Sequence, residues 1–264
     1  LTNEQLRAKA PTLFTNEPYS EVSEKYHFIP TIDVIEEIRF HNWYPVNVSV
    51  ANVRDEEKEG FQQHCVRFRH FEDLLNPKDN AVEILLFNSH DRSKAFSILA
   101  GIFRFVCANG LVISDSVFEA YKIKHLGERD NDVANAVNQI TAIKDKLMNK
   151  INTLSNIKLS QLEKESFAKL SVPLRFEEHL EINHTDLLTP LRDEDYKDDL
   201  YTTLNVIQEN LIRGNISGIN KESGRRFTSK EIKAISTDTH INKGLWDIAE
   251  KIAFIKEPNY QIAA

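Results

Sequence analysis

The sequence predicts an α+β fold, in which an antiparallel meander of three or more strands, with a helix packed across it, precedes a long-helix C-terminal region. Two observations support this prediction. In the N-terminal half, apolar and polar residues alternate in consecutive short segments, as they do in half-buried strands. From residue 132 onward, apolar residues instead recur at every third or fourth position, as along one face of a helix. We expect an α+β core over residues 1–128 and a mainly helical region, packed on that core, over 129–264.

The meander begins after a short helix. Residues 31–42 have helical spacing, and Thr31 is a suitable N-cap residue. From Tyr44 the period changes to two, which starts the first strand. Two further strands are expected over 61–71, where one face is cationic, and over 82–87, which is apolar on both faces apart from one glutamate. Short or medium connections between these strands indicate a meander.

A second helix is expected directly after the third strand. Ser93 is its predicted N-cap, the run from Phe96 to Val106 supplies a wide apolar stripe, and Gly110 follows the last turn. A stripe of that width predicts that the helix packs across the sheet. Residues 111–113 and 120–125 are expected to add edge strands.

The rest of the chain is predicted to form helices separated by loops. Residues 132–170 predict a long helical segment that is suited to self-association, so we expect a homo-oligomer. Further helices are predicted over 199–213, which ends at Gly214, and over 243–255. Residues 213–230 contain three glycines and several cations, a composition that predicts a mobile basic loop.

Composition argues against several classes of protein. No run of eighteen apolar residues occurs, and the first eleven residues do not resemble a signal region, so we expect no membrane association and a cytoplasmic protein. Cys65 and Cys107 have no neighbours at metal-ligand spacing, which predicts buried thiols and argues against a zinc ribbon or a disulfide framework. The net charge of −7 argues against indiscriminate coating of nucleic acid, but it allows a local basic groove.

The run Asn88, Ser89, His90 and Asp91 is the most enzyme-like motif, because it lies between a predicted strand and a predicted helix. One histidine and one aspartate supply at most two ligands to a metal that needs about three. The polar side chains are equally suited to satisfy the start of a helix, so the role of the motif stays open. The sequence has no Walker loop, no G-x-G-x-x-G and no G-x-S-x-G elbow. We therefore expect no cofactor and no metal, and we favour a protein that is not an enzyme.

Cationic residues in separate segments indicate nucleic-acid binding. Arg67 and Arg69 lie on one face of a predicted strand and are followed by His70, so that cations contact successive phosphates while a ring reaches a base. The alternative is that exposed strands and loops carry cations simply to remain soluble. The candidate nucleic-acid-binding residues are Arg67, Arg69, His70, Arg104, Arg213, Lys221, Arg225, Arg226 and Lys230.

Several motifs resemble an uncharacterised family of plasmid and prophage proteins typified by YfjQ, YafZ and YubP. The resembling segments are YHFIPT at 26–31, VRFRH at 66–70, ILLFNSHD at 84–91, GIFRFVCANGLV at 101–112, LIRGNISG at 211–218 and INKGLWDIAE at 241–250. This resemblance implies a domain of unknown function that is carried on mobile genetic elements and has no established activity. The order of a helix, three strands and a helix also resembles, more weakly, the core of single-strand annealing recombinases of the Red-beta and Erf type.

Three functional hypotheses remain open. The leading one is a non-enzymatic accessory protein of a mobile element that binds or anneals single-stranded DNA during recombination. The second is an interaction protein that counters a host defence factor, since the acidic segment 192–199 can dock on a basic host protein. The third is a metal-dependent nuclease or hydrolase centred on His90 and Asp91.

Overall fold

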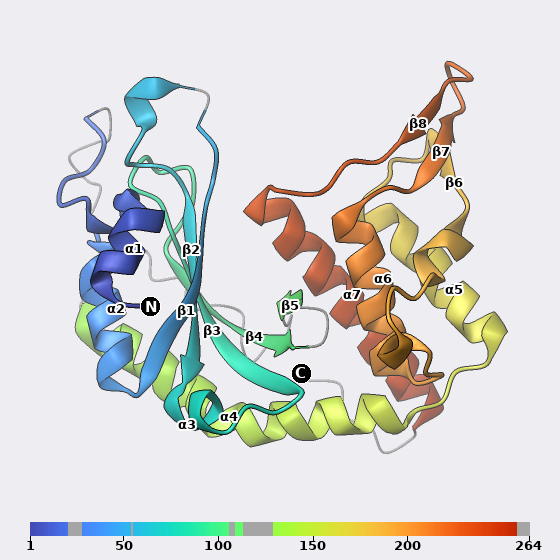
Figure 1. Cartoon of the computed structure of the whole chain (residues 1–264), viewed down its shortest axis with the longest axis horizontal. Coiled ribbons are helices and arrows are strands. Elements are labelled where there is room, and N and C mark those ends of the chain that lie inside the picture. Colours follow the sequence, from blue (N-terminus) through green and yellow to red (C-terminus); the bar gives the residue numbers. More distant parts are fainter. Residues whose placement is uncertain (21–27, 54, 106–108, 113–128, 258–264) are drawn as a thin grey trace. The chain divides into compact units, whose positions relative to one another are not determined.

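The computed structural model of the chain describes residues 1–20, 28–53, 55–105, 109–112 and 129–257 (Figure 1). These residues form two compact units. Unit 1 contains the chain up to Phe103 together with the first part of a long helix, as far as Asp145. Unit 2 contains Arg104, the short strand at 109–112 and the chain from Lys146 onward. Within the described part of the chain, no helix is long and apolar enough to cross a membrane.

Unit 1 is built on an antiparallel sheet whose strands follow one another in chain order. Its strands are β1 (Trp43–Val50), β2 (His64–His70), β3 (Asn80–Asn88) and β4 (Ser97–Arg104). The β1 and β2 strands pair antiparallel with Val48 opposite Val66, and β2 pairs with β3 in the same way with Phe68 opposite Ile84. The α+β class and the meander predicted from the alternating pattern are therefore confirmed.

The helix predicted after the third strand is wrong, because Ser97–Arg104 is the strand β4. Every residue of this strand except Phe103 is buried. An apolar run that is buried on both faces has no strand-like alternation, and its periodicity alone does not distinguish it from a buried helix. Ser93 accordingly caps no helix, and its N–H and hydroxyl both donate to Asp91 Oδ1 in the turn before β4, at 2.9 and 2.6 Å.

The predicted edge strand at 111–113 is found as β5 (Asn109–Val112). Gly110 therefore lies within a strand and does not end a helix. The second predicted edge strand, at 120–125, lies outside the described residues, as does Cys107. Cys65 is buried in β2, as expected for a thiol of the core.

Helices cover the sheet of unit 1. They are α1 (Asn3–Lys9), α2 (Thr31–Phe40), α3 (Phe71–Leu75) and the first part of α4 (Arg129–Asn156), with 3-10 turns at η1 (Pro11–Phe14) and η2 (Glu56–Lys58). The α2 helix packs on β1 through its buried residues Val34, Ile35 and Ile38, as its spacing predicts. Trp43 is fully buried, and its Nε1 donates to Thr141 Oγ1 of α4 at 3.0 Å.

The predicted N-cap of α2 is wrong by one residue. Pro30 occupies the cap position, and Thr31 is the first residue of the helix. The Thr31 hydroxyl is buried and lies 2.8 Å from the His64 ring, so it connects the helix to the sheet and does not cap its own helix.

Unit 2 is mainly helical, as the second half of the sequence predicts. Its elements are the end of α4, α5 (Gln161–Ser171), η4 (Val172–Leu174), β6 (Leu180–Ile182), η5 (His184–Leu188), η6 (Asp193–Asp195), α6 (Leu200–Arg213), β7 (Ser217–Asn220), β8 (Arg226–Thr228) and α7 (Ile235–Lys256). The α6 helix packs against α5, α7 and η5, and its residues from Leu200 to Leu211 are all buried. Asp199 caps it by accepting the N–H of Thr202 at 2.7 Å, and Gly214 ends it.

The segment predicted to be a basic loop is an antiparallel hairpin, β7 and β8, to which β6 adds a third strand. Ser217 lies opposite Thr228. At the tip, Asn220 Oδ1 accepts the N–H groups of Glu222 and Ser223, each at 3.0 Å. Two of the glycines that suggested a loop are instead needed by the hairpin. Gly214 lies where the chain leaves α6, and Gly224 lies where the hairpin turns.

We expect Gly214→Ala to destabilise the protein by about 2 kcal/mol, because this residue adopts a φ of +77° and a Cβ would lie 2.7 Å from the Lys230 carbonyl carbon. The matched control is Gly224→Ala, at a φ of +66° with no atom within 4 Å of the added Cβ. That change should cost about 1 kcal/mol, from the backbone conformation alone. Urea unfolding of both variants makes the comparison, and equal losses would contradict the proposed close approach at Gly214.

Candidate nucleic-acid interface

The NSHD motif builds the connection between β3 and β4. Asn88 Nδ2 donates to the Ile29 carbonyl at 3.1 Å and to Thr31 Oγ1 at 3.0 Å. The Ser89 hydroxyl donates to the carbonyl of Lys94 at 3.0 Å and accepts its N–H at 2.9 Å. Asn88, Ser89 and His90 are fully buried. Asn88 therefore ties the end of β3 to the start of α2, whereas Ser89 fixes the backbone of the turn between β3 and β4.

His90 belongs to a buried pair of histidine rings. Its ring lies 5.3 Å from that of His64, and its Nε2 is 3.4 Å from Thr31 Oγ1. His64 Nδ1 lies 3.1 Å from the Gln62 carbonyl, so in the neutral ring this nitrogen carries the proton and Nε2 accepts from Thr31. Burial, and then the neighbouring His90, lower the pKa of His64 to about 3. Both rings therefore lie within the core of unit 1.

Arg67 and Arg69 are held by one carboxylate. Glu83 on β3 is 1% exposed, and its two oxygens accept from Arg67 Nε at 2.6 Å and from an Arg69 terminal nitrogen at 2.7 Å. Both guanidinium groups also lie 4.7 Å from the centre of the Phe103 ring. The cationic face expected on this strand exists, but its two charges share one carboxylate within the sheet and are therefore partly balanced.

His70, at the end of the same strand, packs edge-on against Trp43 with ring centres 5.3 Å apart. Its Nδ1 lies 3.5 Å from a Glu72 carboxylate oxygen. Partial burial, and then Lys144, lower its pKa. The ring is therefore engaged with neighbouring side chains of unit 1.

Arg104 and Arg213 take part in a charged network of unit 2. An Arg104 nitrogen donates to Asp195 Oδ1 at 2.7 Å, and both groups are buried. Arg192 contacts the same aspartate at 3.1 Å and binds Glu209 with two nitrogens, at 2.7 and 2.5 Å. Glu209 also accepts from Arg213 at 3.2 Å. These cations are thus held by the carboxylates of Asp195 and Glu209.

The remaining predicted cations gather on one element, which we call the basic hairpin (Ser217–Lys230). Lys221, Arg225, Arg226 and Lys230 are all exposed, and none forms an ion pair with another residue that the structure describes. The hairpin contains a single carboxylate, Glu222. This segment therefore carries a net positive charge on the outside of unit 2.

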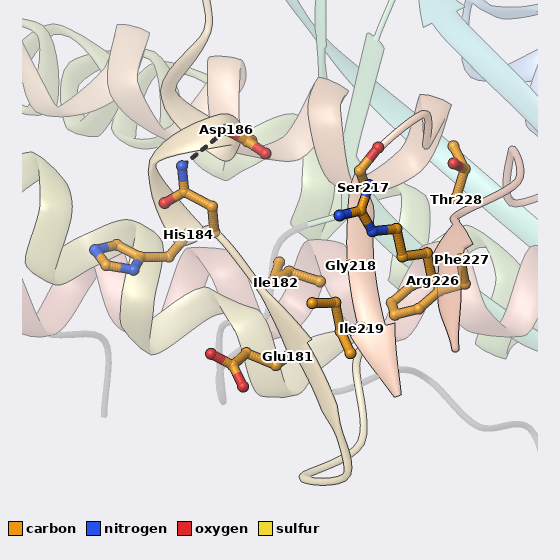
Figure 2. A pocket seen from close by; sticks show the side chains of 11 residues that line it. Glu181, Ile182, His184, Asp186, Ser217, Gly218, Ile219, Arg226, Phe227 and Thr228 are labelled. Carbon is orange, nitrogen blue, oxygen red and sulfur yellow. Dashed lines mark hydrogen bonds between the residues drawn. The ribbon is translucent and has the colours of Figure 1, made fainter. Parts of the chain in front are cut away.

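A groove of about 820 Å³ lies on the three-stranded sheet, next to these cations (Figure 2). Ile182, Ile219 and Phe227 supply its apolar lining. Figure 2 shows the Arg226 guanidinium reaching toward Ser217, whereas the His184 ring points away from the other side chains. The polar lining residues are Glu181, Asn183, His184, Asp186, Ser217, Arg226 and Thr228.

Residues 181–186, on β6 and η5, were not singled out in the sequence. Their only signal is the short polar run Asn183–Asp186, which is typical of a turn, and in the structure Asn183 Oδ1 indeed accepts the N–H of Thr185 at 3.2 Å. Pairing of β6 with β7 brings these residues to the basic hairpin, with Glu181 opposite Ile219. That pairing spans about forty residues and has no local sequence pattern.

The acidic segment 192–199 is largely used inside unit 2. Asp195 binds two arginines, Asp199 caps α6, and Asp198 binds Lys164 at 2.5 Å. Asp193 and Glu194 remain as exposed carboxylates without such a role in the described contacts. Among the described residues, no group of three or more histidine, cysteine, aspartate or glutamate side chains is placed to hold a metal ion.

Comparison with known proteins identifies relatives along nearly the whole chain. The chain is 32% identical over 253 residues to UPF0380 protein YafZ of Escherichia coli (strain K12), which covers 96% of this chain and 91% of YafZ. UPF0380 protein YfjQ of the same organism matches with the same identity and coverage. No solved structure matches. Residues 18–246 match the family described as "Domain of unknown function (DUF932)", and the chain therefore belongs to the DUF932 family.

Proposed function

We propose that the protein binds single-stranded DNA, without enzymatic activity, through the basic hairpin. The observation that carries the proposal is a contrast among the cations. Arg67, Arg69, Arg104 and Arg213 each contact a carboxylate of their own unit. Lys221, Arg225, Arg226 and Lys230 are exposed and form no ion pair among the described residues. Cations that are not already neutralised are the ones that can release counterions from a phosphate backbone.

The chemistry around these cations suits a single strand. Phe227 follows Arg226 on β8 and supplies an aromatic ring, and such rings hold unpaired bases by stacking without regard to sequence. The hydroxyl groups of Ser217 and Thr228, opposite each other on β7 and β8, are neutral donors of the kind that contact phosphates. The resemblance to proteins of plasmids and prophages supplies a setting in which single-stranded DNA is handled.

The proposal is limited to binding. The resemblance in element order to annealing recombinases relied on a helix after the third strand, and that element is the strand β4. The support for annealing and recombination is correspondingly reduced. A host-protein partner has less support still, since most carboxylates of the acidic segment are engaged within unit 2.

The test is an anisotropy titration of a labelled, mixed-sequence single-stranded oligonucleotide. With four phosphate contacts, the logarithm of the binding constant should fall with a slope of about −3 against the logarithm of salt concentration, an affinity loss of about fifty-fold between 50 and 200 mM. Changing Lys221, Arg225, Arg226 and Lys230 together to glutamine should reduce this slope to near zero.

The matched control changes four exposed lysines outside the hairpin to glutamine, which alters the net charge by the same amount. These lysines are Lys78, Lys169, Lys197 and Lys251. The control should bind almost as the unchanged protein does. The proposal fails if both quadruple variants lose the same affinity, or if the unchanged protein binds no single strand at low salt.

A further inference from the structure

We propose that the groove on the three-stranded sheet holds one nucleotide of the bound strand, and that Asp186 makes it prefer bases with an exocyclic amino group. This inference rests on the proposed function and specifies which part of the bound DNA contacts the groove. A groove of about 820 Å³ is within the range that encloses a small ligand the size of a nucleotide.

One end of the groove has the chemistry of a phosphate site. Residues on one face of a strand recur at every second position, so Ser217 and Ile219 share a face of β7, and Arg226 and Thr228 share a face of β8. Because Ile219 lies opposite Arg226 and Ser217 opposite Thr228, all four side chains are on the same face. The Arg226 guanidinium and the hydroxyl groups of Ser217 and Thr228 thus lie together at this end of the groove. All three groups can donate hydrogen bonds to phosphate oxygens.

The middle of the groove is apolar. Ile219 is 45% exposed there and lies opposite Glu181 of β6. The Phe227 ring lies directly over β7 at Gly218, where a Cβ would come within 2.6 Å of the ring. Because Phe227 pairs with Gly218, its ring lies on the other face of the sheet, and the exposed Ile219 is what offers a flat base a surface from which water is displaced.

The other end carries a hydrogen-bond acceptor. Asp186 Oδ1 accepts from Asn183 Nδ2 at 3.1 Å, as the dashed line in Figure 2 shows. A carboxylate accepts hydrogen bonds and cannot donate them, so it favours the amino groups of adenine, cytosine and guanine. Thymine flanks its one ring N–H with two carbonyl oxygens, which the carboxylate repels. The partly buried position of Asp186 strengthens this discrimination relative to water.

The experiment compares equal-length labelled oligo-dC and oligo-dT with the unchanged protein at one salt concentration. We expect oligo-dC to bind about tenfold more tightly, the effect of one hydrogen bond to a charged group. Asp186→Asn should remove this preference, because an amide both donates and accepts. The matched control, Asp193→Asn, makes the same charge change on an exposed carboxylate outside the groove and should keep the preference.

The outcomes separate the two proposals. Equal affinity for oligo-dC and oligo-dT in the unchanged protein, with the steep salt dependence intact, overturns the groove assignment and leaves the basic hairpin as the binding element. A preference that survives in Asp186→Asn also overturns it. If the unchanged protein binds neither oligonucleotide, the proposed function itself is overturned.

Discussion

Replacing Glu83 by glutamine is expected to lower the free energy of unfolding by about 3 to 5 kcal/mol, because removing one partner of a buried ion pair leaves an uncompensated buried charge. The Glu83 carboxylate is 1% exposed and binds both Arg67 and Arg69. The guanidinium groups lie over the Phe103 ring, where they are shielded from water on that side.

Urea unfolding of the variant at neutral pH, followed by circular dichroism, measures this loss. The matched control is Glu72→Gln, which removes a glutamate that is 74% exposed and also contacts a histidine and a lysine. Exposed ion pairs contribute about 0 to 1 kcal/mol, so the control should unfold nearly as the unchanged protein does. If both variants lost the same stability, burial of the Glu83 cluster would not matter to folding.

Acidification is expected to destabilise the fold through His64. Its pKa is about 3 in the folded protein, lowered by burial and then by His90, against an ordinary value of 6.5. Above pH 6.5 the ring is neutral in both states, and stability is complete. As the pH falls below that value, the unfolded chain binds a proton that the folded protein does not, and stability is lost at up to about 1.4 kcal/mol per pH unit. The loss amounts to about 3 kcal/mol by pH 4.

The measurement is the free energy of unfolding at several pH values between neutrality and pH 4, with His64→Gln as the test variant. That variant should be less stable at neutral pH, since it disturbs the contact with Thr31, but its stability should fall less steeply on acidification. His240→Gln removes an exposed histidine and serves as the control, with an unchanged pH slope. A steep loss that persists in His64→Gln would assign the acid sensitivity to other groups.

The sequence pattern was sufficient to predict an element where its apolar residues follow the period of a strand or of a helix. The alternation in β1 and β2 and the capped, amphipathic α6 were predicted close to their observed bounds. The apolar run at β4 failed because burial on both faces removes the period that separates strand from helix. The glycines of the basic hairpin misled in a different way, since glycine suits both a loop and a tight turn between strands.

The candidate site was harder to predict because the state of a cation depends on its spatial neighbours. Arg69 and Glu83 are fourteen residues apart in the sequence, and Arg104 and Asp195 are ninety-one apart. No spacing rule connects such partners. Composition alone identified the hairpin as basic. Only the fold shows that its cations differ from the arginines that contact carboxylates.

The internal neutralisation of so many arginines also shapes how a polyanion meets the molecule. The net charge of −7 repels a strand that comes close to most of the surface. The field of the basic hairpin reaches only about 8 Å at physiological ionic strength. Under the proposed function, capture of a strand would therefore depend on whether it meets the basic hairpin first.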